Sequence, residues 1–197
     1  MPRFTNAAAA GTLILSALGG VALACSAPAS ATGASYSRES LIDLPPAQSA
    51  VGADIAQLHR ALAPFHKLEE ARAASWPLAV TSCWFHQGLG AMGYHYGDPQ
   101  RFDATIDPLR PEVLLYEPLA GGKFKLVAAE FIVPFQAWTD SAPPRAFGQE
   151  FVRDERLGIY ALHVWTGREN PAGLFAPWNP KVSCDHAAES EDRGSTH

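Results

Sequence analysis

The pattern of apolar residues changes at Trp76-Pro77, and this change constrains the fold more than any other feature of the chain. Before it, apolar residues recur at steps of three and four from Val51 to Phe65, which is typical of an amphipathic helix. Pro64 interrupts this helix and begins a second helical piece, which ends before Pro77. The domain therefore begins with a helix or a kinked pair of helices.

Strand patterns replace the helical period after Pro77. Apolar runs bounded by turn residues cover 78–85, 91–96, 112–117, 124–133 and 157–166. The pair Gly121-Gly122 between the third and fourth runs predicts a β-hairpin. Parallel strands would need helical crossovers, and none is visible between these runs. The sequence predicts an α+β fold, with the N-terminal helix or helix pair packed on an antiparallel sheet of about five strands.

The ends of the chain lie outside this predicted domain. Arg3 precedes a small, apolar run over 7–24, which is typical of a secretory signal peptide over 1–31 with cleavage after residue 24 or 31. A retained membrane anchor is the weaker interpretation, because the run is rich in Ala and Gly, so we expect no transmembrane span in the mature form. We expect a linker over 32–46, one globular domain over 47–184 and a disordered tail over 185–197.

Cys25 leaves two processing routes open. It directly follows Ala22-Leu23-Ala24, which resembles a bacterial lipoprotein site where the cysteine is lipidated and anchors the mature protein. Cleavage after Ala31 would instead remove Cys25. Both routes predict an extracytoplasmic protein, and we favour simple secretion over a membrane-anchored lipoprotein.

Two cysteines, Cys83 and Cys184, remain in the predicted domain. An even pair in an exported protein is most simply explained by a disulfide bond. Closing a loop of about 100 residues stabilises a fold by roughly 4 to 5 kcal/mol in the chain-entropy model. We therefore predict that a Cys83–Cys184 disulfide ties the start of the sheet to the last ordered segment.

Composition excludes several classes of protein but names no reaction. Hydrophobic residues make up 47% of the chain and charged residues 18%, which is typical of neither a disordered chain nor a membrane bundle. The net charge is -5 and no basic stripe is present, so nucleic-acid binding is not expected. The chain has no GxSxG, HExxH or CxxC motif. Whether the protein is an enzyme is left open.

Four predicted strands each place an ionisable residue on an otherwise apolar face. Side chains two residues apart share a face of a strand, and this alternation selects His95, Glu117, Glu130 and His163. A buried, unpaired carboxylate costs several kcal/mol, so such a group shifts its pKa or finds a partner. We predict that these four residues form one interior cluster.

This cluster has three interpretations. Imidazole and carboxylate ligands suit one divalent metal ion, namely zinc, manganese, iron or copper, and His66 on the helix is a secondary candidate ligand. Alternatively, the protein is a secreted binding or interaction module, and the cluster is a structural hydrogen-bond network. A carboxylate-based hydrolase that uses Glu117 and Glu130 is the third interpretation.

Five motifs in order resemble a family of uncharacterised exported bacterial and fungal proteins. They are GAMGYHY at 90–96, PEVLLYE at 111–117, LVAAEF at 126–131, LHVW at 162–165 and WNPKVSC at 178–184. The resemblance extends from about Ala61 to Cys184. That family has no established activity, so the resemblance implies export and the extent of the domain, but no reaction, substrate or cofactor.

Overall fold

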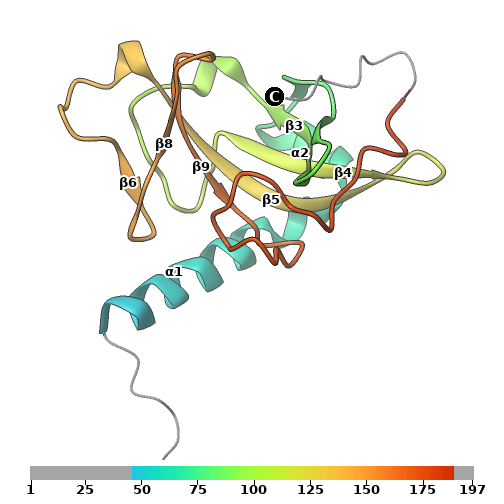
Figure 1. Ribbon diagram of the computed structural model, residues 1–197, viewed down its shortest axis with the longest axis horizontal. Coiled ribbons are helices and arrows are strands. Elements are labelled where there is room, and N and C mark those ends of the chain that lie inside the picture. The colour runs from blue at the N-terminus through green and yellow to red at the C-terminus, as the bar shows by residue number, and fades with distance from the viewer. Residues whose placement is uncertain (1–45, 189–197) are drawn as a thin grey trace, which may run out of the picture. The chain divides into compact units, whose positions relative to one another are not determined.

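The computed structural model describes residues 46–188 (Figure 1). The predicted signal peptide, most of the predicted linker, Cys25 and the end of the predicted tail lie outside the described residues. No helix in the described range is long and apolar enough to cross a membrane.

The kinked helix pair is confirmed. Helix α1 covers Pro46–Leu62, a short 3-10 helix η2 covers Ala63–His66 and α2 covers Leu68–Ala74. Pro64 lies in the first turn of η2, where its missing N–H costs nothing. After α2 ends, the indole Nε1 of Trp76 donates a hydrogen bond of 3.0 Å to the carbonyl oxygen of Pro111, which joins the end of the helices to the start of a central strand.

The main sheet has seven strands, and all of its pairings are antiparallel. The strand order is β1-β3-β4-β5-β9-β8, and β2 also pairs with β3. The strands are β1 Leu78–Ala79, β2 Trp84–His86, β3 Gly90–Gly97, β4 Val113–Leu119, β5 Lys123–Pro134, β8 Val152–Asp154 and β9 Ile159–Val164. A separate small hairpin pairs β6 Arg145–Ala146 with β7 Gln149–Glu150. The predicted α+β class is therefore confirmed.

The strand predictions differ from the structure mainly at the sheet edge. The Gly-Gly hairpin is confirmed: β4 and β5 flank it, and Gly121 and Gly122 have φ angles of 75° and 71°, which favour glycine. The run 78–85, expected as one strand, forms the short β1 and β2, which pair with opposite ends of β3. Strands β6, β7 and β8 were not predicted, because two or three mostly exposed residues carry no alternating apolar pattern.

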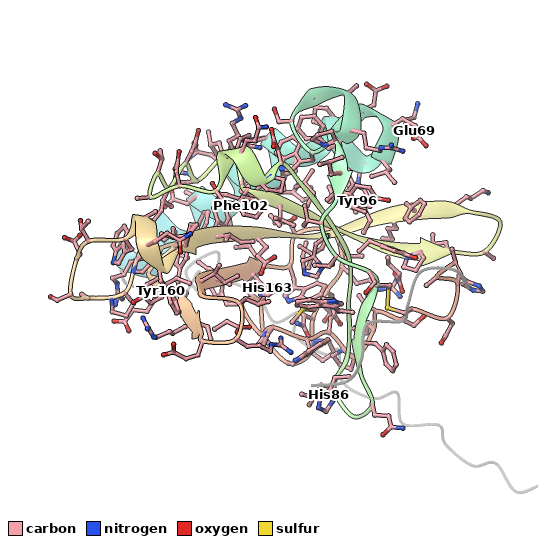
Figure 2. The ribbon with its side chains drawn as sticks, turned by 90° about the horizontal axis from the view of Figure 1, so that it is seen from above. Glu69, His86, Tyr96, Phe102, Tyr160 and His163 are labelled. Atoms are coloured by element: carbon pink, nitrogen blue, oxygen red, sulfur yellow. A yellow bond between two sulfur atoms is a disulfide. The ribbon has the colours of Figure 1, made fainter. Side chains whose placement is uncertain are left out.

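The two faces of the sheet have different roles. Tyr116 lies on the face that meets the helices, where its hydroxyl donates a hydrogen bond of 2.6 Å to the carbonyl oxygen of Phe65. The neighbouring residue Leu115 pairs with His95, and Val113 pairs with Glu130, so these side chains lie on the opposite face. Figure 2 shows Glu69 of α2 and His163 on opposite sides of the central strands.

The C-terminal segment packs against β3 and is covalently attached. The predicted disulfide Cys83–Cys184 is confirmed. Ala91 and Asn179 exchange two backbone hydrogen bonds of 3.1 Å. A Cβ atom on Gly90 would lie 2.1 Å from the carbonyl oxygen of Asn179, so only glycine allows this approach. The segment is thereby fixed beside the face of the sheet opposite η2 and α2, which we call the helix-free face.

Candidate metal centre

Three of the predicted cluster residues meet on the helix-free face, from strands β3, β5 and β9. Glu130 of β5 and His163 of β9 are direct cross-strand partners. His95 of β3 lies two strands away from β5, across a span of roughly 10 Å. Val113 of β4 stands opposite Glu130, and its small side chain lets Glu130 and His95 extend toward each other over β4.

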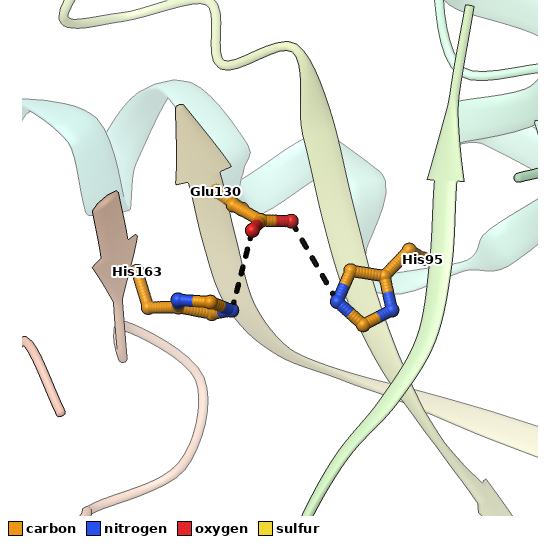
Figure 3. Close-up of side chains that lie close together, drawn as sticks. All are labelled: His95, Glu130 and His163. Atoms are coloured by element: carbon orange, nitrogen blue, oxygen red, sulfur yellow. Dashed lines mark ion pairs between the residues drawn. The ribbon is translucent and has the colours of Figure 1, made fainter. Parts of the chain in front are cut away.

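The two imidazoles point at the two oxygens of the same carboxyl group (Figure 3). Nε2 of His95 lies 3.6 Å from Oε2 of Glu130, and Nε2 of His163 lies 3.5 Å from Oε1. These distances are longer than the about 2.7 to 3.2 Å of a hydrogen bond from nitrogen to oxygen. Both Nε2 atoms are buried without a hydrogen-bond partner. The cluster thus contains two orphaned nitrogen atoms that face one carboxyl group.

Burial determines the charges of this cluster. Exposed fractions are 3% for His95, 5% for Glu130 and 7% for His163. Burial, with smaller contributions from Glu112 and Asp154, raises the pKa of Glu130 to about 8. Burial, followed by the charge of His163, lowers the pKa of His95 to about 3 against an opposing contact with the Gly93 backbone. Burial also lowers the pKa of His163 to about 4.

The cost of desolvating all three groups therefore outweighs their mutual attraction, although each histidine lies within ion-pair distance of the carboxylate. Near pH 7 the metal-free cluster contains two neutral imidazoles and one protonated carboxyl group. Neutral imidazole is the form that binds metals.

Thr81 determines which nitrogen of His95 has a free lone pair. Its hydroxyl donates a hydrogen bond of 2.8 Å to the carbonyl oxygen of Ser82 and lies 2.9 Å from Nδ1 of His95. The hydroxyl has one proton, so when it donates to Ser82, Nδ1 of His95 is the donor in the second bond. The proton of the neutral ring is then on Nδ1, and Nε2 directs its lone pair toward Glu130. A hydrogen bond that fixes the tautomer in this way is a common feature of metal-ligating histidines.

The spacing of the three groups suits a metal ion. At bond lengths of 2.0 to 2.1 Å, neighbouring ligand atoms of a tetrahedral zinc site lie about 3.4 Å apart. The two nitrogen–oxygen distances of 3.5 and 3.6 Å are close to this edge, and they end on the two different oxygens of the Glu130 carboxyl group. One ligand atom from each of the three residues lies within 4.8 Å of the others. The group His95, Glu130 and His163 could therefore hold a metal ion.

Glu117, the fourth predicted member, lies elsewhere. It is on the same face of β4, but four residues beyond Val113, roughly 13 Å along the strand from the position opposite Glu130. Its Oε1 accepts a hydrogen bond of 3.2 Å from the backbone N–H of Ser183, and its Oε2 lies 3.7 Å from the guanidinium of Arg168. Alternation identified the correct face, but it contains no information on position along the strand.

The separation of Glu117 from Glu130 also bears on the hydrolase hypothesis. A pair of glycosidase carboxylates lies about 5 to 9.5 Å apart, and the distance along β4 exceeds this range. The strand positions of Glu117 and Glu130 are therefore farther apart than such a pair requires, and their side chains have separate partners.

His66 is also distant from the cluster. It is exposed at the end of η2, and η2 packs on the opposite face of the sheet through the contact of Phe65 with Tyr116. The structure thus brings together three of the five candidate ligands.

Three residues that sequence reasoning did not select also shape this region. Thr81 contacts His95, and the ring of Trp84 packs against His95 with centroids 5.3 Å apart. Glu112, which directly precedes β4, is buried. It accepts a hydrogen bond of 3.1 Å from the backbone N–H of Ile132. Burial raises the pKa of Glu112 to about 7. Glu112 is the second residue of the PEVLLYE motif, and its charge beside an apolar strand was the one available signal.

The fold and this site define an α+β domain with a buried two-histidine, one-carboxylate group. Comparison with protein-family models, with curated proteins and with solved structures finds no match to the chain. The chemistry of the site itself is therefore the basis for assigning a function.

Proposed function

We propose that the protein is an exported metal-binding protein that holds one divalent transition-metal ion through His95, Glu130 and His163. Zinc, manganese, iron and copper are the candidate ions, because imidazole nitrogen and carboxylate oxygen suit all four. The observation that carries the proposal is the pair of buried, partnerless Nε2 atoms directed at one buried carboxyl group.

A structural hydrogen-bond network explains this arrangement less well. Each Nε2 lies beyond hydrogen-bond distance of Glu130. Leaving a buried polar atom unpaired costs about 1 to 3 kcal/mol, and the cluster contains two such atoms. A metal ion between the three groups would satisfy both nitrogens and neutralise the carboxylate, so one event would remove every unfavourable feature of the site.

The number of ligands favours an open site. Structural zinc sites usually have four protein ligands, whereas catalytic sites have three and leave a position for water or substrate. His95, Glu130 and His163 supply three. Two histidines and one carboxylate are also the ligands of a non-haem iron site with open positions. The bound metal would act as a Lewis acid toward whatever occupies the open position.

Export is supported by the disulfide. Disulfides persist in oxidising compartments and are rare in the cytosol, and Cys83–Cys184 joins segments 101 residues apart. The N-terminal pattern of a signal peptide and the resemblance to exported proteins support the same location. We propose secretion, with lipid anchoring at Cys25 as the alternative.

The test is metal analysis of tag-free protein purified with its disulfide intact. The chain is dialysed against each of the four metals and then against buffer, and metal content is measured by inductively coupled plasma mass spectrometry. We expect about one ion per chain for at least one metal. His163→Ala and His95→Gln should lose it. His86→Ala is the control, because His86 packs on Trp178 outside the cluster and its loss should leave metal content unchanged.

Circular dichroism of each variant separates loss of metal from loss of fold. The proposal fails if no metal is retained stoichiometrically by the folded wild-type protein. It also fails if folded His163→Ala and His95→Gln both retain as much metal as the wild type.

A further inference from the structure

The candidate metal centre borders two cavities. The larger, of about 360 Å³, contains His95 in its wall, and the smaller, of about 90 Å³, contains His163. Four residues line both cavities: Trp84, Glu130, Leu157 and Ile159. Glu130 therefore lies between the two spaces, and a metal bound beside it would face them.

The larger cavity, which we call the apolar cleft, is lined almost entirely by hydrocarbon. Of its ten lining residues only Thr81, His95 and Glu130 are polar. Thr81 is already bonded to Ser82 and His95, and the other two are the proposed metal ligands. None of the described lysines and arginines lines the cleft, although the guanidinium of Arg156 lies over the ring of Trp84, 5.7 Å from its centroid.

This lining excludes several classes of ligand. A sugar would bury hydroxyl groups without partners, at a cost of about 1 to 3 kcal/mol each. A phosphate or nucleotide would need the cationic donors that such groups normally bind. The cleft suits a ligand whose body is apolar and whose polar atoms gather at one end, beside Glu130 and His95.

The volume limits the size of that ligand. An apolar protein cavity of about 150 Å³ holds one benzene molecule. At the same cavity volume per ligand atom, a cavity of about 360 Å³ holds roughly a dozen non-hydrogen atoms. This volume is at the lower end of the range of about 300 to 1,000 Å³ for small-molecule sites, which are likewise mostly apolar with few polar groups.

We infer that the apolar cleft binds a small, mainly apolar molecule whose oxygen end coordinates the metal held by His95, Glu130 and His163. The inference rests on the proposed metal site and specifies its ligand class. Trp84, packed against His95, forms one wall. Leu157, in the turn before β9 and 45% exposed, lies where the cleft opens to solvent.

The test uses two metal-binding probes that differ only in their apolar part. Cobalt(II) is titrated first, and its visible absorption bands report whether the metal site is filled. Acetohydroxamate and benzohydroxamate are then titrated into the cobalt-loaded protein. Both bind the metal through the same oxygen atoms, but only benzohydroxamate has a phenyl group to fill the cleft. Burial of the phenyl group should make benzohydroxamate bind at least about tenfold more tightly.

Two leucine variants locate the effect. Leu157→Gln removes apolar surface from the opening of the cleft and should weaken benzohydroxamate at least about threefold. It should leave cobalt and acetohydroxamate binding unchanged. Leu109→Gln is the matched control, because Leu109 is also 45% exposed but does not line the cleft. It should change neither probe.

The outcomes separate the two proposals. If neither cobalt nor any of the four candidate metals binds stoichiometrically, the metal site fails and the ligand inference fails with it. If cobalt binds but the two hydroxamates bind equally, or if the Leu157 and Leu109 variants behave alike, the metal site stands and the inference about the cleft is overturned.

Discussion

Two buried glutamates on the same face of the sheet, Glu130 and Glu117, have opposite surroundings. Their exposed fractions are 5% and 4%, and both lie in long apolar strands. The carboxylate of Glu117 receives a backbone N–H from Ser183 and lies near the guanidinium of Arg168. The carboxyl group of Glu130 instead faces the imidazoles of His95 and His163.

Burial of a carboxyl group therefore does not by itself mark a functional site. Glu117 accepts one hydrogen bond from the backbone N–H of Ser183 and lies within ion-pair distance of Arg168, so it anchors the C-terminal segment, although its Oε2 accepts no hydrogen bond. Glu130 faces the Nε2 atoms of two histidines, and neither nitrogen lies within hydrogen-bond distance of it. Only the second arrangement gains from an added cation.

The largest expected effect concerns the segment that Glu117 anchors. Cys184 directly follows Ser183, so the disulfide and Glu117 hold the same piece of chain. The double variant Cys83→Ser, Cys184→Ser should lose about 4 kcal/mol of unfolding free energy, because a loop of about 100 residues is no longer closed in the unfolded chain. Urea denaturation monitored by tryptophan fluorescence measures this loss. A change below about 1 kcal/mol would mean that non-covalent contacts such as Glu117–Ser183 suffice.

Exchange of each glutamate for glutamine tests the comparison directly. Glu130→Gln removes a proposed ligand and should weaken metal binding by more than about 100-fold, since even residues behind the ligands contribute about 10- to 100-fold. Its metal-free stability should change little, because glutamine resembles the protonated acid. Glu117→Gln should retain metal affinity but lose about 1 to 3 kcal/mol of stability, since its charge is used.

Calorimetric metal titration gives the metal affinity of each variant, and urea denaturation gives its free energy of unfolding. The comparison breaks if the two variants lose metal affinity equally. It also breaks if Glu130→Gln, without metal, is destabilised as much as Glu117→Gln.

Much of the fold could be predicted from local patterns. The change of period at Trp76-Pro77 predicted helices followed by strands, and Gly121-Gly122 predicted the β4–β5 hairpin. Both depend on residues that are neighbours in sequence. The break of the run 78–85 into β1 and β2 could not be predicted, because it depends on how this segment meets β3.

The sequence predicted which face of the sheet carries the candidate site, but not which residues belong to it. Alternation placed His95, Glu130 and His163 on one side of the sheet, and it placed Glu117 there too. Membership depends on the register between strands, including the irregularity at Leu115 and Tyr116 in β4. Thr81 lies within the predicted strand 78–85 but is not ionisable, so alternation did not select it, and only the folded chain brings it to His95.

Thr81 offers a finer test on the Glu130 side of the comparison. Thr81→Val keeps the shape of the side chain but removes the oxygen that accepts the Nδ1–H of His95. Metal affinity should fall by about 10- to 100-fold, as for other residues that orient metal-ligating histidines. Thr81→Ser retains the hydroxyl and should bind metal nearly as well as the wild type. Equal losses in the two variants would contradict the proposed role, and calorimetric titration distinguishes the outcomes.

The smallest expected effect is the dependence of metal binding on pH. Burial raises the pKa of Glu130 to about 8, whereas the pKa values of His95 and His163, lowered to about 3 and 4, leave both rings neutral above pH 6. The metal must displace only the Glu130 proton, so affinity should be about tenfold lower at pH 7 than at high pH and should level off above about pH 9. Binding should release about 0.9 proton at pH 7 and about 0.2 at pH 8.5. Cobalt titrations in two buffers of different ionisation enthalpy measure this release.

The direction of this pH dependence distinguishes Glu130 from the metal's own chemistry. Release from Glu130 declines as pH rises, because the carboxyl group is already ionised before the metal arrives. Proton release that increases with pH would come from a water molecule bound to the metal, because the metal ion lowers the pKa of that water toward 7. Glu117→Gln should reproduce the wild-type curve, since its carboxylate already has the backbone N–H of Ser183 and takes no part in the exchange. A change in that variant would show that the two glutamates act as one site and would remove the distinction between them.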